Sequence, residues 1–250
     1  MPALHPSPTV AVVIPAKDEQ ERIAATVRAV AGLPVVDVVV VVDDGSSDLT
    51  SKAARDAGAV VVAHARNRGK AAAMQTGARA VADWERARPR PGVRPRPLLF
   101  VDADLADSAV ATAPLAGPVL AGEADMTIAV LPRQATAGGG HGFVVGLSRR
   151  GTVAATGWSP EQPLSGMRCL SRAAFEAALP LARGWGVETA LTIDLLRAGF
   201  RVVEVPCDLH HRVTGRDLRA QVHRAKQFRD VARALGRRRV ADALGRLTRG

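Results

Sequence analysis

Short runs of apolar residues recur along the chain, and helix-like patterns separate them. Runs without polar interruption are typical of strands that are buried on both faces of a sheet. The sequence predicts such strands at Thr9–Ile14, Val35–Val42, Ala59–Ala63, Leu98–Val101, Met126–Leu131 and Phe200–Val205. Pro15 is expected to end the first of them.

The segments between these runs carry apolar residues at helical spacing. Helices are predicted at Lys17–Ala31, Leu49–Ala57, Ala71–Trp84, Arg172–Leu181, Glu188–Ala198 and Gln221–Leu235. The acids Asp18, Glu19 and Glu21 are expected in the first turn of the first helix, where they suit its dipole. Alternating strands and helices predict an α/β fold with a mostly parallel central sheet flanked by helices.

Composition fits one α/β domain with an appendage. The chain has 250 residues, of which 47% are hydrophobic, and no apolar stretch reaches the roughly 20 residues of a membrane span. The first residues show no secretory pattern, and two cysteines in unrelated contexts suggest a reduced, cytoplasmic protein. Aromatic residues make up only 3% of the chain, which disfavours stacking on single-stranded nucleic acid.

Positive charge is concentrated in the last forty or so residues. The formal net charge is +10, and residues 212–250 hold twelve Lys or Arg against three acids. The predicted helix in this tail is amphipathic. It suits either an anionic membrane surface or packing of its apolar stripe onto the domain with arginines in solvent, and an anionic partner is a third alternative.

Two carboxylates follow the strand predicted at Leu98–Val101. Side chains two residues apart in an extended segment point the same way, so Asp102 and Asp104 should be aimed together at the carboxyl end of the sheet, where open α/β sheets bind ligands. Such a pair suits a hard divalent cation. The alternative is an Asp-rich turn without a ligand. Dinucleotide-binding and P-loop glycine motifs do not occur, which disfavours a dehydrogenase and a P-loop NTPase.

Several motifs in order resemble one family. VVIPAKDEQERI, VVVVDDGSSDLT, NRGKAAAMQTGARA, VDADL, PLSGMRCLSRAAF and GVETALTIDLLRAGFRVVEVP are similar to family 2 glycosyltransferases of the GT-A fold, above all to polyprenyl-phosphate sugar transferases such as dolichol-phosphate mannose synthases. The resemblance implies a GT-A domain over residues 1–211, followed by a basic helical extension at 212–250.

The resemblance also implies a binding site for a nucleoside-diphosphate sugar such as a UDP- or GDP-sugar. Pro15, Ala16 and Glu19 would line the pocket for base and ribose, and Asp44 would reach the base or ribose. Lys70, at the start of a helix, would meet the pyrophosphate.

The metal implied by the resemblance is Mg²⁺ or Mn²⁺. Asp104 would be its first ligand, and Asp102 would bind ribose or reach the metal. His211 would complete the metal shell, with His210 as a competitor for that role and a loop histidine without a ligand as the alternative.

Residues near the acceptor follow from the same likeness. Glu188 would be a general base for a hydroxyl acceptor or would orient groups for a phosphate acceptor; it also suits the dipole of a helix start. Arg168, together with Arg149 and Arg150, would bind an acceptor phosphate.

The predicted function is an inverting, metal-dependent transfer of a sugar to a polyprenyl phosphate. The protein would then be cytoplasmic and peripheral at the inner face of the membrane. Alternatives are a soluble transferase to a small phosphorylated acceptor such as 3-phosphoglycerate, a sugar-1-phosphate nucleotidyltransferase, and a basic nucleic-acid-binding module. PAKDEQER is not the Gly-rich loop that the nucleotidyltransferase would need, and no motif for reading nucleic acid is found.

Overall fold

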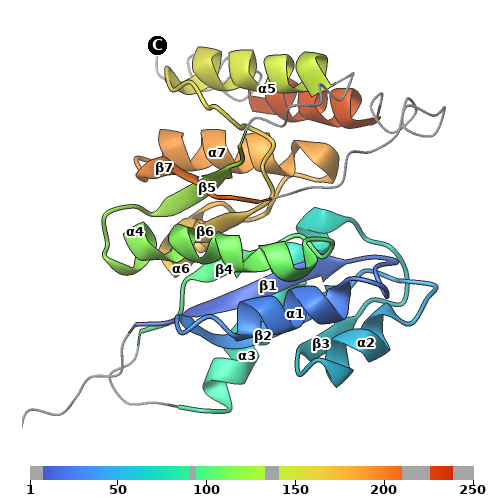
Figure 1. The fold of residues 1–250 in the computed structure, drawn as a ribbon. Helices are drawn as coiled ribbons and strands as arrows, with labels where there is room; N and C mark the ends of the chain where they lie inside the picture. The colour runs from blue at the N-terminus through green and yellow to red at the C-terminus, as the bar shows by residue number, and fades with distance from the viewer. Residues whose placement is uncertain (1–7, 90–93, 133–140, 210–225, 239–250) are drawn as a thin grey trace, which may run out of the picture.

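The chain folds around one seven-stranded sheet (Figure 1). A computed structural model describes residues 8–89, 94–132, 141–209 and 226–238. The strands are β1 (Val10–Ala16), β2 (Val36–Asp43), β3 (Val60–Ala63), β4 (Leu98–Phe100), β5 (Met126–Val130), β6 (Arg168–Leu170) and β7 (Val202–Pro206). Their order is β3-β2-β1-β4-β6-β5-β7, and only β6 runs antiparallel to its neighbours. The predicted mostly parallel sheet is confirmed.

Helices cover both faces of this sheet. One layer holds α1 (Ile23–Ala31), α2 (Thr50–Asp56), the 3-10 helix η1 (Ala106–Leu115) and α4 (Ala116–Leu120). The other holds α3 (Lys70–Arg86), α6 (Arg172–Ala177) and α7 (Val187–Arg197). In β1 the even-numbered residues pack against the first layer and Ala11 and Val13 against the second, as the two-residue period of a strand requires. This double burial explains the unbroken apolar runs.

The first strand does not end at Pro15. In β1, Val13 accepts a hydrogen bond from Val101 on the β4 side, and Ala16 accepts one from Asp44 on the β2 side. By this alternation the nitrogen of Pro15 faces the β4 side, beyond the last β4 pairing at Phe100. The missing N–H of proline therefore removes no ladder hydrogen bond.

The first helix begins six residues later than predicted, at Ile23, and its first turn contains no acid. Residues 17–22 instead form a loop in which Asp18 has a φ of 55°. Polar partners from the loop after β2 hold this segment, so tertiary contacts override its helical pattern.

Five described elements escaped the sequence pattern. They are η1, α4, β6, α5 (His141–Thr156) and the 3-10 helix η2 (Gly184–Gly186). The residues of α5 carry no clear apolar period, so the pattern predicts no helix there. With only three residues, β6 is too short for any periodicity to identify it.

Part of the basic tail packs onto the domain. Residues 226–238 are helical, and Val231 and Leu235 join Val144 of α5 and Ile193 of α7 in a third apolar cluster. Arg238 also forms an ion pair with Asp194. For these residues the packing alternative holds, and Arg229, Arg233 and Arg237 are exposed. The remainder of the tail, including residues 221–225 of the predicted helix, lies outside the described residues, so the boundary at 211/212 stays a prediction. No helix in the described part is long and apolar enough to cross a membrane.

Candidate active site

A pocket of about 680 Å³ opens at the carboxyl ends of β1, β2 and β4. It gathers segments that are far apart in the sequence: the loop after β1, the loop before α3, the turn after β4 and the start of α7. Its lining residues are Pro15, Ala16, Lys17, Asp18, Glu19, Asp44, Asn67, Gly69, Lys70, Ala73, Asp102, Ala103, Asp104, Gly184, Trp185 and Glu188. Eight of the residues that the sequence singled out therefore lie together.

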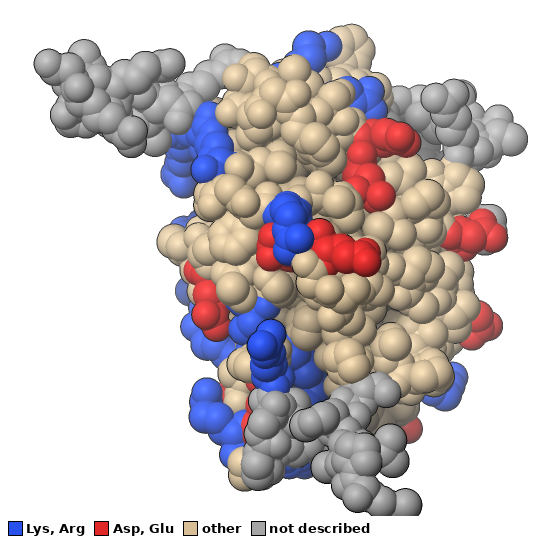
Figure 2. Space-filling model, turned by 90° about the vertical axis from the view of Figure 1, so that its left-hand side faces the viewer, with Lys and Arg blue, Asp and Glu red and all other residues tan. Residues whose placement is uncertain are grey.

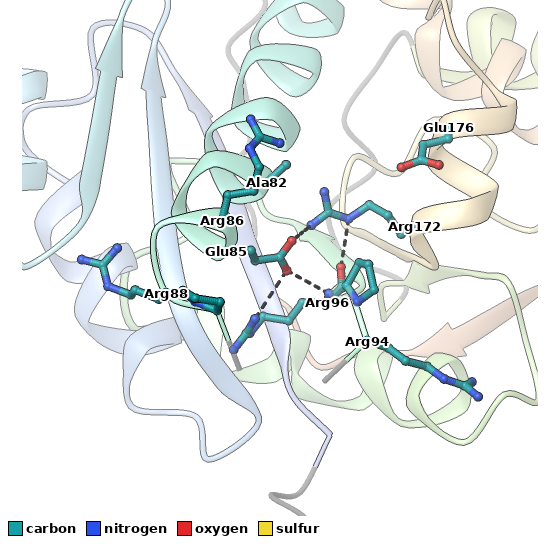
Figure 3. A pocket seen from close by; sticks show the side chains of 10 residues that line it. Ala82, Glu85, Arg86, Arg88, Arg94, Arg96, Arg172 and Glu176 are labelled. Carbon is teal, nitrogen blue, oxygen red and sulfur yellow. Dashed lines mark hydrogen bonds and ion pairs between the residues drawn. The ribbon is translucent and has the colours of Figure 1, made fainter. Parts of the chain in front are cut away.

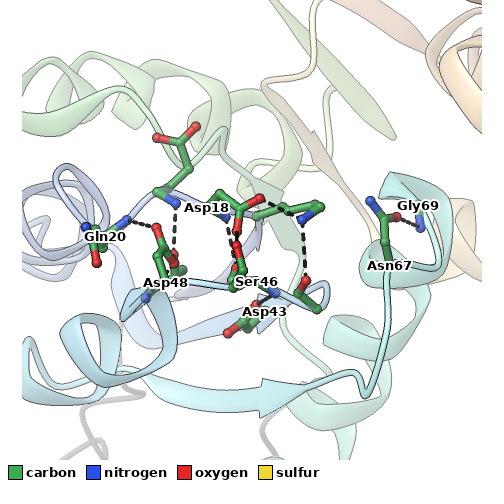
Figure 4. Close-up of polar contacts among 12 residues, drawn as sticks. Asp18, Gln20, Asp43, Ser46, Asp48, Asn67 and Gly69 are labelled. Atoms are coloured by element: carbon green, nitrogen blue, oxygen red, sulfur yellow. Dashed lines mark hydrogen bonds and ion pairs between the residues drawn. The ribbon is translucent and has the colours of Figure 1, made fainter.

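One wall of the pocket is the loop after β1, which the loop after β2 fixes in place (Figure 4). The carboxylate of Asp18 accepts hydrogen bonds from the backbone N–H and hydroxyl of Ser47 at 2.8 and 3.2 Å. In return, the backbone N–H of Asp18 donates to Ser46 at 2.9 Å, and that of Gln20 donates to Asp48 at 3.2 Å. These contacts explain why the DDGSSD cluster follows the second strand.

Asp44 organises the loop that leads to Lys70. One of its carboxylate oxygens lies 2.7 Å from Nδ1 of His64 and accepts the Arg68 N–H at 2.8 Å. The other oxygen accepts the N–H of Gly69 at 2.7 Å. Side chains of Asp44 and His64 are only 7% and 5% exposed. Each carboxylate oxygen has two lone pairs, so the second oxygen retains one for a ligand in the pocket.

Lys70 joins two of the predicted acids. It starts α3, and its Nζ lies 2.8 Å from Asp102 and 3.3 Å from Glu188. Burial alone would lower the pKa of Lys70, but the charges of Asp102 and Glu188 outweigh that effect and raise it. Lys70 is therefore a permanent cation facing the pocket.

Glu19 and Asp104 form the more acidic side of the pocket. Burial raises the pKa of Glu19, and the nearby charge of Asp104 raises it further, although Arg22 partly opposes the shift. A cation bound beside Glu19 and Asp104 would favour the ionised form of Glu19.

Gly166, which the sequence did not single out, lies against the ion pair between Lys70 and Asp102. A Cβ at this position would be 2.4 Å from Nζ of Lys70 and 2.8 Å from both carboxylate oxygens of Asp102. Only glycine fits there without displacing the ion pair. Its signal was present in the SGMRC motif, but contacts of this kind cannot be read from the chain.

Trp185 is a second lining residue that was missed. It is 40% exposed and lies in the short 3-10 helix η2 (Gly184–Gly186), directly before α7. Its backbone N–H donates to Asp230 at 3.3 Å, and a Cβ on Gly184 would be 2.3 Å from the same carboxylate. The helix at 226–238 therefore supports the rim of the pocket.

Arg168 is placed differently from the prediction. Its side chain is fully buried outside the pocket lining, and burial lowers its pKa to about 10. The guanidinium donates to Thr192 at 2.8 Å and to the carbonyls of Ser165, Pro163 and Glu188 at 2.8, 3.1 and 3.1 Å. The predicted contact with an acceptor phosphate stays a prediction; in this structure the contacts of the guanidinium lie in the core, where it anchors the start of α7.

The predictions for Arg149 and for the two histidines of the metal shell have different outcomes. Arg149 donates to the carbonyls of Pro160 and Glu161 at 2.8 and 2.7 Å, so it braces a loop. His210 and His211 lie outside the described residues. Among the described residues, no three His, Cys, Asp or Glu side chains converge closely enough to hold a metal ion by themselves.

The mostly parallel sheet covered by helices on both faces is the architecture of the GT-A class, and comparisons with known proteins agree. The profile of glycosyl transferase family 2 matches residues 11–140. The chain therefore belongs to glycosyl transferase family 2 and has the GT-A fold.

Two similar proteins are glucosyl-3-phosphoglycerate synthases. A glucosyl-3-phosphoglycerate synthase of Mycolicibacterium paratuberculosis is 32% identical over 203 residues, which cover 74% of this chain and 59% of that protein. The synthase of Mycobacterium tuberculosis is 32% identical over 218 residues, covering 74% of this chain and 60% of that protein. The aligned region of this chain thus spans about three fifths of the length of these relatives.

Solved structures of the tuberculosis enzyme resemble the whole described fold. The complex with phosphoglyceric acid has a TM-score of 0.71 at 29% identity and covers 92% of this chain and 80% of its own. The complex with Mn²⁺, UDP and phosphoglyceric acid has a TM-score of 0.71 at 28% identity, covering 92% and 78%. A complex of the same enzyme with Mg²⁺ and UDP has a TM-score of 0.69 at 27% identity, covering 92% and 79%.

Proposed function

We propose that this protein transfers a sugar from a UDP-sugar to a small phosphorylated acceptor of the phosphoglycerate type, with the help of Mn²⁺ or Mg²⁺. The observation that carries the proposal is the single pocket that gathers Asp44, Lys70, Asp102, Asp104 and Glu188. Relatives that bind UDP, a divalent cation and phosphoglyceric acid support this choice of ligands.

The charge of the pocket supports a role for a divalent cation. Six acids and two lysines line it, so a nucleoside diphosphate, itself an anion, would be repelled. Carboxylates are the oxygen ligands that Mg²⁺ and Mn²⁺ prefer, and Mg²⁺ often uses one or two of them together with substrate phosphates. Asp104 and Asp102 would hold the ion. When bound, it neutralises charge on the departing nucleoside diphosphate.

Lys70 supplies the other positive charge for the diphosphate. It stands at the first residue of α3, whose N-terminal N–H groups also favour an anion. The donor's phosphates would compete with Asp102 and Glu188 for its ammonium group. Pro15, Ala16, Glu19 and Asp44 line the same pocket and would surround the base and ribose.

Glu188 lines the pocket from the start of α7 and would face the reacting sugar. Because Lys70 lies 3.3 Å away, releasing Lys70 to the diphosphate would free this carboxylate to orient the acceptor or to accept a proton from it. An inverting course remains the prediction from the family resemblance, and the anomeric configuration of the product, measured by NMR, decides it.

A small acceptor is favoured over the polyprenyl phosphate predicted first. The similar proteins are named for phosphoglycerate. The tail helix at 226–238 also buries Val231 and Leu235 against α5 and α7. Neither observation supports a lipid acceptor or membrane contact.

The proposal can be tested with purified protein and radiolabelled donor. UDP-glucose, GDP-glucose and ADP-glucose are each incubated with Mn²⁺ or Mg²⁺ and with 3-phosphoglycerate, glycerate or a polyprenyl phosphate. Metal-dependent transfer from UDP-glucose to 3-phosphoglycerate, with little transfer to glycerate, is expected, and Asp104→Asn should abolish it while preserving the circular dichroism spectrum. Transfer confined to polyprenyl phosphate, or full activity in Asp104→Asn, would contradict the proposal.

A further inference from the structure

A second cavity lies at the opposite end of the sheet from the candidate active site (Figure 3). Its volume is about 480 Å³. The last turn of α3, the segment that enters β4 and the start of α6 form its walls. The lining residues are Ala82, Glu85, Arg86, Arg88, Pro89, Arg94, Pro95, Arg96, Arg172 and Glu176. Residues 90–93, which join two of these segments, lie outside the described part of the chain.

Arginine dominates this cavity, with five guanidinium groups against two carboxylates. Glu85 is already engaged: it lies 2.9 Å from Arg172 and 3.5 Å from Arg96, and it accepts the backbone N–H of Arg96 at 2.9 Å. Asp83 and Asp37, which lie outside the lining, pair with Arg86 and Arg96, so the excess of positive charge in the cavity rests on Arg88 and Arg94. Figure 2, which views the molecule from the left-hand side of Figure 1, shows Lys and Arg gathered over the lower part of that face.

Arg172 and Arg96 are both held rigidly by contacts with the surrounding chain. Arg172 donates to the carbonyls of Arg96 and Ala78 at 3.2 and 3.4 Å. Burial lowers the pKa of Arg172, and the charge of Arg96 adds to that effect against Glu85 and Glu176. The charges of Glu85 and Glu176 therefore do not fully offset the effects of burial and of the neighbouring Arg96.

Arg96 carries a buried hydrogen-bond donor that has no acceptor among the described residues. It is 6% exposed, pairs with Asp37, and lies with its guanidinium carbon 5.2 Å from the Trp84 ring. Its Nε is buried and has no hydrogen-bond partner among the described residues. A buried donor without a partner is costly. An anion in the cavity would not reach this nitrogen, which is closed to solvent, but its negative charge would offset the charge of the guanidinium.

We propose that the arginine cavity at the C-terminal end of α3 is a binding site for a small phosphorylated metabolite. Guanidinium groups pair with phosphate through two parallel hydrogen bonds, and the volume falls in the range of small-molecule sites. Arg88 and Arg94 are exposed at the rim, where they can reach an entering anion, while Arg96 and Arg172 form the fixed floor.

An anion should need a divalent cation to bind in the candidate active site but not in the arginine cavity, so an experiment without divalent cations distinguishes the two sites. Without a cation, the six acids of the candidate active site repel an anion, whereas the arginine cavity does not need a cation. Pyrophosphate binding is therefore measured by calorimetry in EDTA, at fixed ionic strength, so that neither donor nor sugar transfer is involved.

The test variant is Arg88→Gln/Arg94→Gln. Arg28→Gln/Arg55→Gln, at two exposed arginines on α1 and α2, is the control that removes the same number of surface charges. Wild type and Arg28→Gln/Arg55→Gln should bind pyrophosphate equally, and the test variant should bind about tenfold or more weakly with an unchanged melting temperature without ligand. No binding by the wild type, equal binding by the test variant, or an equal loss in the control variant would overturn the proposal. Failure of sugar transfer would leave this result untouched.

Discussion

Replacing Leu235 with alanine tests whether the basic tail helix belongs to the domain. Leu235 is 7% exposed and packs onto α5 at Gly151, where an added Cβ would be 2.5 Å from its methyl carbons. Glycine leaves no side chain there that could fill the space. Truncating a buried leucine to alanine costs roughly 2–5 kcal/mol, and about 3 kcal/mol is expected here because one side of the helix faces solvent. In a chain of this size, each 1 kcal/mol lowers Tm by roughly 2–4 °C, so a fall of about 6–12 °C should follow.

The assay is thermal unfolding followed by circular dichroism, with Phe228→Ala as the matched control. Phe228 is on the same helix but 46% exposed, so its truncation should change Tm by only about 1–2 °C. A separate, lipid-seeking helix would give a different result: Leu235→Ala would leave Tm unchanged, and both variants would lose binding to anionic liposomes. That outcome would refute the docked arrangement.

Two further predictions concern the pocket. Because the pKa of Glu19 is raised in the folded state, its ionised form opposes folding above the pKa of the unfolded chain, and this penalty vanishes as the pH falls below that value. Glu19→Gln should therefore raise Tm at pH 7 and have less effect near pH 4; an equal gain at both pH values would contradict the sign. Gly166→Ala should reduce sugar transfer strongly with little loss of stability, because the added methyl group displaces the flexible ends of Lys70 and Asp102; unchanged kcat and KM would show that this ion pair does not matter.

The sequence predicted the sheet and most of the site for one physical reason. Strands buried on both faces leave continuous apolar runs, and parallel strands bring their carboxyl ends to one edge. Asp44 follows β2 and Asp102 and Asp104 follow β4, so their meeting with Lys70 follows from topology. The family resemblance then assigned roles that no periodicity can supply.

Other features depend on contacts between distant segments, which local patterns do not encode. The stretch after β1 is acidic and looks like a helix start, yet hydrogen bonds to Ser46 and Asp48 hold it as a loop. Arg168 lies two residues after Gly166 in the SGMRC motif, for which the family resemblance predicts phosphate binding, yet on the short strand β6 its side chain lies in the core. There it donates to the carbonyls of Pro163, Ser165 and Glu188.

Charge shows the same difference between sequence and fold. Counting along the chain places nearly all of the positive excess in residues 212–250, and the remainder looks neutral. Folding separates that neutral remainder into an acidic pocket at the carboxyl ends of the strands and an arginine cavity at the opposite end. Because α3 runs from Lys70 in the first to Glu85 and Arg86 in the second, one helix carries both, with about 24 Å between its ends at 1.5 Å per residue. An anion should therefore need a divalent cation to bind at one end of α3 and none at the other, and no count of charges along the sequence would reveal that difference.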